Sequence, residues 1–212
     1  MKKLMTAVLM FCGVIATSAE EKWSDKHDFR WGISGGMNLS KVTSFHSDFR
    51  VGFDAGLNIE IAQKKKLNYI GAGLHLSQKG FQRDVLVDDG VSIKLKGNPL
   101  YLEVPFWAGH RHQLGKNTFY FTDSGPYFAF GVGGKLKGET QIAGASVTEK
   151  ENYFSEEGAN ARAFDMGWGV RMGIETHGVQ FHVAYQYGFL KTYKMYDSHH
   201  NANLNIGLSY YF

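Results

Sequence analysis

The chain is short of cysteine, proline and net charge, and these shortages exclude several classes of protein. Its single cysteine, Cys12, lies near the amino terminus, so no disulfide framework can hold the 212-residue chain together. The formal net charge is +3, and loss of Lys2 and Lys3 lowers it by two, to +1. A nucleic-acid binder would need a strongly basic face, so we expect no nucleic-acid partner. Proline is scarce at 3 residues, whereas glycine reaches 26.

Long apolar runs are also missing. The run from Leu4 to Ala16 follows a short basic segment and precedes the small residues Thr17, Ser18 and Ala19. It is too short for a membrane-spanning helix, which needs about 20 apolar residues, and this order is typical of a secretory signal. We therefore expect residues 1–19 to be a cleaved signal peptide and 20–28 a short periplasmic segment. No second run approaches that length, so any membrane insertion must use strands.

What the sequence has in abundance is alternation of apolar residues with small or polar ones, the two-residue period of a β-strand. Eight such segments are predicted as strands: 29–39, 49–62, 67–81, 98–112, 118–136, 164–175, 179–190 and 202–212. One face carries large apolar side chains such as Trp31, Leu57 and Phe181, and over those stretches it holds no charged residue. The opposite face is small or charged. Each strand therefore meets two different environments.

Alternation alone does not decide which face is inside. In a secreted lipocalin-like carrier the apolar face would be the core, whereas in a membrane barrel it would meet lipid. Glycines gather on the polar face, where they relieve crowding in a narrow barrel, and Trp and Tyr lie toward strand ends, as at a membrane interface. The last strand also runs to Phe212 with nothing after it. We predict an all-β fold, an eight-stranded antiparallel up-and-down transmembrane β-barrel over residues 29–212.

The connections alternate in length. Segments 63–66, 113–117 and 176–178 are short, whereas 40–48, 82–97, 137–163 and 191–201 are longer. Transmembrane barrels have short periplasmic turns and long outer loops, so we expect both termini in the periplasm. Loops carry most binding functions. The acidic loop 137–163 is therefore the candidate contact site for a protein or glycan, the alternative being a solvated mobile loop.

Several motifs resemble those of the small bacterial outer-membrane β-barrel domain family that includes PorT-type proteins. Asn98-Pro99-Leu100-Tyr101-Leu102-Glu103-Val104-Pro105 is similar to its Y-L-E-(I/V)-P fourth-strand signature, and segments 125–134, 165–169 and 185–188 and the Tyr211-Phe212 ending are similar to its later strands. The resemblance covers essentially the whole mature chain. It implies an outer-membrane address, lipid as surroundings, and the barrel-assembly machinery and periplasmic chaperones as biogenesis partners. Tyr210 and Phe212 would then form the assembly signal.

The charged residues predicted to face the lumen are the main candidate site. They are Arg30, Arg50, Asp54, Glu60, Glu103, Lys135, Asp165, Arg171 and Glu175. Four bases against five acids suit mutual pairing, because unpaired buried charge is costly. We expect a structural plug that sets strand register. The alternatives are a proton or ion path and a narrow porin-like channel.

No catalytic, cofactor or metal residues are predicted. His110 and His112 are expected at the opposite end of the barrel from His199 and His200, so the two pairs cannot supply converging metal ligands. The segment 198–202 is only superficially similar to the His and Ser region of lipid A-modifying barrel hydrolases, since Asn201 cannot act as a nucleophile. We therefore expect a structural or interaction protein without catalysis, the alternative being a subunit of a secretion or surface-assembly complex.

Overall fold

The computed structural model describes residues 27–43, 48–63, 67–88, 91–142, 145–155, 160–193 and 199–212. The described chain forms ten strands: β1 (His27–Val42), β2 (Arg50–Gln63), β3 (Asn68–Gln78), β4 (Phe81–Asp88), β5 (Val91–Gly115), β6 (Thr118–Ile142), β7 (Ala145–Asn152), β8 (Phe164–Thr176), β9 (Val179–Gly188) and β10 (Asn201–Tyr211). No helix in the described ranges is long and apolar enough to cross a membrane. The predicted signal peptide, residues 1–19, lies outside the described residues, as does most of segment 20–28.

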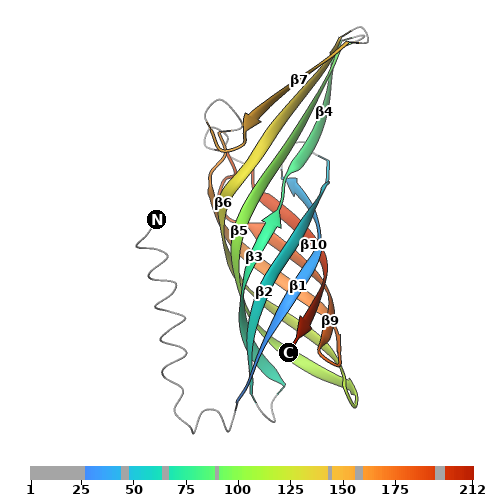
Figure 1. Cartoon of the computed structure of the whole chain (residues 1–212), viewed down its shortest axis with the longest axis vertical. Helices are drawn as coiled ribbons and strands as arrows, with labels where there is room; N and C mark the ends of the chain where they lie inside the picture. The colour runs from blue at the N-terminus through green and yellow to red at the C-terminus, as the bar shows by residue number, and fades with distance from the viewer. Residues whose placement is uncertain are drawn as a thin grey trace.

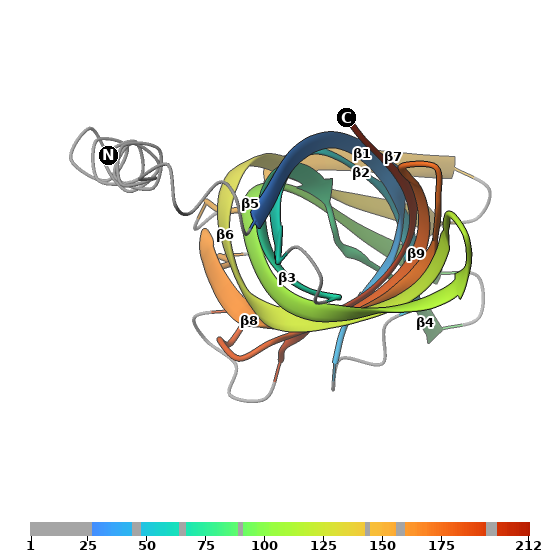
Figure 2. The ribbon, with the colours of Figure 1, turned by 90° about the horizontal axis from the view of Figure 1, so that it is seen from below.

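Eight of these strands close into a barrel, seen end-on in Figure 2. Neighbours pair in the order β1, β2, β3, β5, β6, β8, β9 and β10, and every pair is antiparallel. The barrel closes where β10 pairs with β1, from Gly32 opposite Tyr211 to Val42 opposite Asn201. The predicted eight-stranded barrel is confirmed.

Two further strands build a sheet that projects beyond the barrel. Strands β5 and β6 are 25 residues each and continue past the barrel rim, where β4 pairs with β5 and β7 pairs with β6. The resulting four-stranded order β4-β5-β6-β7 forms the long tip in Figure 1, and we call it the projecting sheet. The prediction that segments 82–97 and 137–163 are loops is therefore wrong over most of their length. In β5 the apolar residues Ile93 and Leu95 alternate with Lys94 and Lys96, but in the parity opposite to that of the apolar face of the barrel strand, so this face does not continue into the projecting sheet.

The apolar face of the barrel is its outer surface. Trp31 and Leu57 keep 48% and 58% of their surface exposed, whereas Glu60 on the opposite face is fully buried at 0%. Burying polar groups while exposing large apolar ones is the reverse of a water-soluble protein. A lipid-facing exterior explains it. The lipocalin-like alternative, with an apolar core inside the barrel, is therefore wrong.

The β5–β6 and β8–β9 turns lie at the end of the barrel that also holds the first residues of β1 and the last residues of β10, as Figure 1 shows. The turn between β8 and β9 consists of His177 (φ 50°) and Gly178 (φ 82°). Positive φ at both central residues is the type I′ geometry that matches the twist of a two-residue hairpin. At this turn end the last residue is held as well, because the Phe212 amide donates to the Trp31 carbonyl at 2.8 Å.

Candidate functional site

The lumen near the turn end is crossed by a ring of two arginines and two glutamates. Arg30 Nε donates to Glu60 Oε1 and its Nη2 donates to Glu175 Oε2, both at 2.9 Å. Arg111 donates to the same two carboxylates, with Nε at 2.9 Å from Glu175 Oε2. Gln180 adds a hydrogen bond to Glu175 at 2.8 Å. The four charges cancel, and we call this group the turn-end ring.

A second ion pair lies beside the ring. Arg171 Nη2 donates to Asp123 Oδ2 at 2.8 Å, and the Tyr69 hydroxyl donates to the same oxygen at 2.6 Å. The Arg171 guanidinium also lies 4.5 Å from the centroid of the Trp107 ring. Aromatic faces attract cations, and more so where water is excluded. Arg171 and Asp123 therefore add a second layer of paired charges to the lumen, above the turn-end ring.

A third charged group lies toward the other end. Lys79 Nζ donates to Glu103 Oε2 at 2.5 Å and lies 4.5 Å from the centroid of the Tyr127 ring. Glu103 also accepts a hydrogen bond from Gln186, whose own carbonyl oxygen accepts from Asn203 at 3.2 Å. We call Lys79, Glu103, Gln186 and Asn203 the upper network. Nearby, Asp165 accepts from Asn201 at 2.9 Å and from Tyr127 at 3.3 Å.

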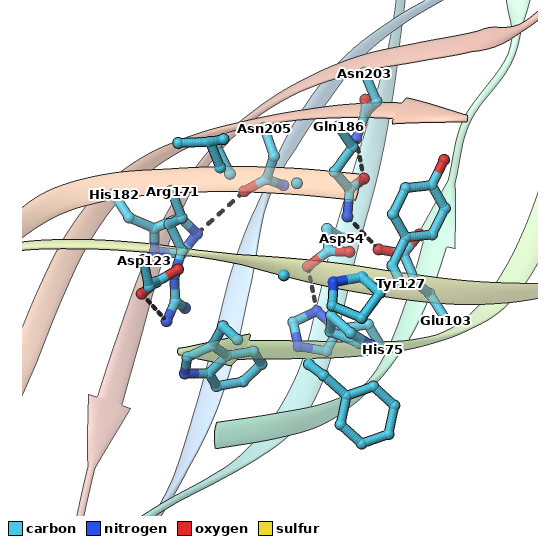
Figure 3. A pocket seen from close by; sticks show the side chains of 18 of the residues that line it. Asp54, His75, Glu103, Asp123, Tyr127, Arg171, His182, Gln186, Asn203 and Asn205 are labelled. Carbon is cyan, nitrogen blue, oxygen red and sulfur yellow. Dashed lines mark hydrogen bonds and ion pairs between the residues drawn. The ribbon is translucent and has the colours of Figure 1, made fainter. Parts of the chain in front are cut away.

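A small cavity of about 80 Å³ lies between these layers. Figure 3 shows His75 and His182 on its wall. His75 Nδ1 lies 2.8 Å from Asp54 Oδ1 and its Nε2 lies 2.9 Å from Asn58 Oδ1, whereas His182 Nε2 lies 3.1 Å from Asn205 Oδ1. A space of this size, with these polar side chains on its wall, has room for a few water molecules. It is far smaller than a usual small-molecule site, which takes about 300–1,000 Å³.

Aromatic rings close the lumen below the projecting sheet. Phe81, Tyr153, Phe154 and Tyr193 form this aromatic cap, with Phe81 and Tyr193 edge-on at 6.3 Å and Tyr153 and Phe154 at 5.3 Å between ring centroids. Leu95 and Leu136 of the projecting sheet pack against the same cluster. Burial raises the pKa of Tyr193 to about 12 and raises that of Tyr153 well above its ordinary value. The cap is therefore a buried aromatic layer above the upper network.

The charged residues predicted from sequence fall into two groups. Seven face the lumen with a described polar partner: Arg30, Asp54, Glu60, Glu103, Asp165, Arg171 and Glu175. Arg50 is only half-buried, and its buried Nε has no hydrogen-bond partner among the described residues. Lys135 is exposed, on the outer face of β6. These two stand apart from the lumen networks.

A β-bulge explains the position of Lys135. Tyr101 of β5 lies opposite Gly131, but the preceding Leu100 lies opposite Gly133, so β6 has one extra residue, Val132. One inserted residue exchanges the faces of everything beyond it. The alternation that places Tyr127 and Ala129 in the lumen therefore sends Lys135 outward. The expectation that Lys135 faces the lumen needs this correction.

Three charged lumen residues were missed by the sequence analysis: Lys79, Arg111 and Asp123. All three had a usable signal in the alternation of their predicted strands. Lys79 has the parity of His75 in the third predicted strand, and Arg111 has the parity of Glu103 in the fourth. Asp123 likewise shares the parity of buried Tyr127. Following the alternation to the end of each strand would have found all three.

The histidine pairs do not converge. His110 and His112 are exposed on β5 near the turn end, whereas His199 and His200 follow the last loop and contact the rings of Tyr193 and Tyr187. Within the described ranges no cluster of three His, Cys, Asp or Glu could hold a metal ion.

The family model described as outer membrane protein beta-barrel domain matches residues 18–194. Among solved structures, Ail of Yersinia pestis has 12% identity and a TM-score of 0.37, covering 88% of this chain and 99% of its own. Neisserial surface protein A (NspA) has 9% identity and a TM-score of 0.42, with the same two coverages.

OprG from Pseudomonas aeruginosa has 12% identity and a TM-score of 0.32, covering 88% of this chain and 95% of its own. No curated protein matches the chain.

Proposed function

The chain belongs to the outer membrane protein β-barrel domain family, and we propose that it is a closed, non-catalytic barrel that holds its projecting sheet outside the membrane as an interaction surface. The observation that carries this proposal is the filled lumen. The turn-end ring, the upper network and the aromatic cap occupy it at three successive levels. An eight-stranded barrel is just wide enough to be filled by side chains.

Solute passage would require these layers to open. Arg30 and Arg111 each bridge Glu60 and Glu175, so displacing any one of the four side chains leaves the ring with one uncompensated charge. An uncompensated buried charge costs about 3–5 kcal/mol. The same pairing supports the structural role proposed for the network, since it ties β1, β2, β5 and β8 together at one level.

Conductance of purified protein in planar bilayers tests the closed lumen. We expect no discrete conductance steps, with folding checked by the different gel mobility of boiled and unboiled samples. A quadruple variant, Arg30→Ala, Glu60→Ala, Arg111→Ala and Glu175→Ala, removes the ring without leaving a single charge behind. The upper network and the cap should keep it closed as well. Regular single-channel steps from the unaltered protein would establish the narrow channel instead.

The orientation follows the usual arrangement of such barrels, with short turns in the periplasm and longer segments outside. We propose that both termini are periplasmic and that the projecting sheet lies outside the cell. Cys12 is the chain's only cysteine, so residues 20–212 accept single-cysteine reporters. An impermeant maleimide should label Lys137→Cys on intact cells but Asn117→Cys only after the outer membrane is broken. Labelling of Asn117→Cys but not of Lys137→Cys on intact cells would show that the projecting sheet faces the periplasm.

The projecting sheet is the candidate contact site for a protein or glycan partner, including a secretion or surface-assembly complex. Its edge strands, β4 and β7, each pair with one described strand, and apart from a single bridge between Gln82 of β4 and Asp48 their outer edges are unpaired among the described residues. Unpaired edges are templates for added strands. Shortening both hairpins, by removing 84–94 and 139–149, should abolish partner capture while the barrel keeps its gel mobility shift. Equal capture by the full-length and shortened proteins would rule out this surface.

A further inference from the structure

The two faces of the projecting sheet differ sharply in charge. Residues directly opposite each other on antiparallel strands share a face, so the register assigns each side chain. One face holds Phe81, Leu95 and Leu136, which belong to or pack against the aromatic cap. The other face carries five lysines with two acids, and we call it the lysine face: Lys94, Lys96, Lys135, Lys137 and Lys150, with Asp84 and Glu139.

The lysine face continues the lipid-facing surface of the barrel. Along β5, Lys94 and Lys96 have the parity of Leu102 and Phe106, which are exposed on the barrel exterior. Along β6, Lys135 and Lys137 also face outward, because the bulge at Val132 places them opposite the outward-facing Asn98 and Lys96 of β5.

Lys96 and Leu100 are four positions apart, about 13 Å at the rise of a strand. The lysines therefore begin where the apolar band ends. In a membrane this is the level of the lipid headgroups.

Three of the lysines stand in a row across three strands. Lys96 lies opposite Lys137, and Lys137 lies opposite Lys150 on its other side. Adjacent strands are about 4.8 Å apart, so the row spans about 10 Å. Like charges directly opposite one another destabilise a sheet. None of the three forms a salt bridge with a described residue.

The neighbouring rows show that the chain can balance charge in this sheet. Lys94 lies between Asp84 of β4 and Glu139 of β6, so acids flank it on both sides. On the other side of the row, Lys135 lies between Asn98 and Asn152 and meets no like charge. The uncompensated positive charge is therefore concentrated on Lys96, Lys137 and Lys150, with Lys135 beside them.

We propose that the lysine face binds the phosphate-bearing headgroups of anionic lipids in the leaflet at this end of the barrel. Lysine stems can lie along apolar acyl surface while the ammonium groups reach the headgroups. Basic residues at an anionic membrane surface are attracted at close range. Headgroup phosphates would relieve the repulsion within the row and hold the base of the projecting sheet against the membrane. The binding goes beyond the proposed function and holds whether or not the lumen conducts.

Titration of the micelle-solubilised full-length protein with phosphatidylglycerol, followed by native mass spectrometry, tests this site. The variant Lys96→Gln/Lys137→Gln/Lys150→Gln should lose affinity by about fivefold per lysine, on the order of 100-fold in total. Lys116→Gln in the β5–β6 turn is the control for loss of a cation elsewhere and should bind as the unaltered protein does. Phosphatidylcholine should show no difference among the variants.

A second variant separates charge from fold. Lys96→Arg/Lys137→Arg/Lys150→Arg keeps all three cations and should retain affinity within a few-fold, and all variants should keep the gel mobility shift of a folded barrel. Unchanged phosphatidylglycerol binding by the glutamine variant overturns the proposal. It is also overturned if the glutamine variant loses binding only to dextran sulfate, a soluble polyanion, because the occupant would then be a soluble acidic polymer rather than a lipid.

Discussion

Lys79 and Glu103 form a buried ion pair inside the barrel, with Nζ and Oε2 2.5 Å apart and side chains only 2% and 4% exposed. Lys79 belongs to the connection between β3 and β4, whereas Glu103 lies on β5 within the Tyr-Leu-Glu-Val-Pro segment. The pair therefore ties the base of the projecting sheet to the barrel wall. It also seals the lumen beneath the aromatic cap.

Removing one partner of this pair should cost more than removing both. Lys79→Met leaves Glu103 as a buried charge supported mainly by Gln186, so we expect a loss of about 3–5 kcal/mol in the free energy of unfolding. Lys79→Met/Glu103→Gln removes both charges and should recover much of that loss. Urea unfolding in detergent micelles measures all three proteins. A double variant no more stable than Lys79→Met would show that the pair is not coupled.

Deleting Val132 should straighten β6 without exchanging the faces of its outer part. The deletion removes the one residue that has no partner on β5, so Gly133 stays opposite Leu100, and Leu136 still packs against the aromatic cap. Lys137→Cys should therefore react rapidly with maleimide and Leu136→Cys slowly, both with Val132 present and in the deletion background. A reversed order of the two rates in the deletion background would mean that β6 had slipped by one residue against β5.

Stability should fall at high pH because the aromatic cap buries neutral phenols. Burial raises the pKa of Tyr193 to about 12, from the value of about 10 expected in the unfolded chain. The neutral phenol therefore contributes its full stabilisation below pH 10 and loses it as the pH rises toward 12, about 2–3 kcal/mol at most. Tyr193→Phe removes this titration. Unfolding free energies measured across that interval should fall less steeply for the variant, and parallel curves would contradict the linkage.

The terminal aromatic should matter more for assembly than for stability. Phe212 stacks on Trp31 with ring centroids 4.2 Å apart and planes inclined by 19°. Such a pair is worth about 0.5–1.5 kcal/mol beyond its buried area. Phe212→Ala should therefore refold in detergent with a small loss, yet reach the outer membrane of cells poorly if Phe212 and Tyr210 form the proposed assembly signal.

Trp31→Ala is the matched control for this prediction. It removes the same stacking contact but leaves the terminal residue intact, so it should assemble in cells nearly as well as the unaltered protein. Membrane fractions probed by boiled and unboiled gels measure the assembled share. Equal assembly defects in the two variants would assign the effect to the stacking contact and not to a signal.

In β5 and β6 the sequence predicts the part of each strand that lies in the barrel, but not the part that extends into the projecting sheet. The alternation of Leu100, Leu102 and Val104 with Tyr101 and Glu103 identified both the strand and its two faces, because side chains of a pleated strand alternate whatever the strand pairs with. On the amino-terminal side of Leu100 the outward-facing positions hold Lys96 and Lys94, and the apolar residues Ile93 and Leu95 have the opposite parity. The apolar face that marks the barrel strands therefore ends at Leu100, although the strand itself continues.

The sequence by itself determined the strands of the barrel, its polar lumen and its lipid-facing exterior, since each follows from local alternation and from the contrast between lipid and water. Tertiary structure alone decided which charges meet. Arg30 and Glu175 are 145 positions apart and become partners only when β10 closes onto β1. The bulge at Val132, which sends Lys135 outward, likewise depends on how β6 pairs with β5. Pairing across a closed sheet is a property of the whole chain, and no single strand encodes it.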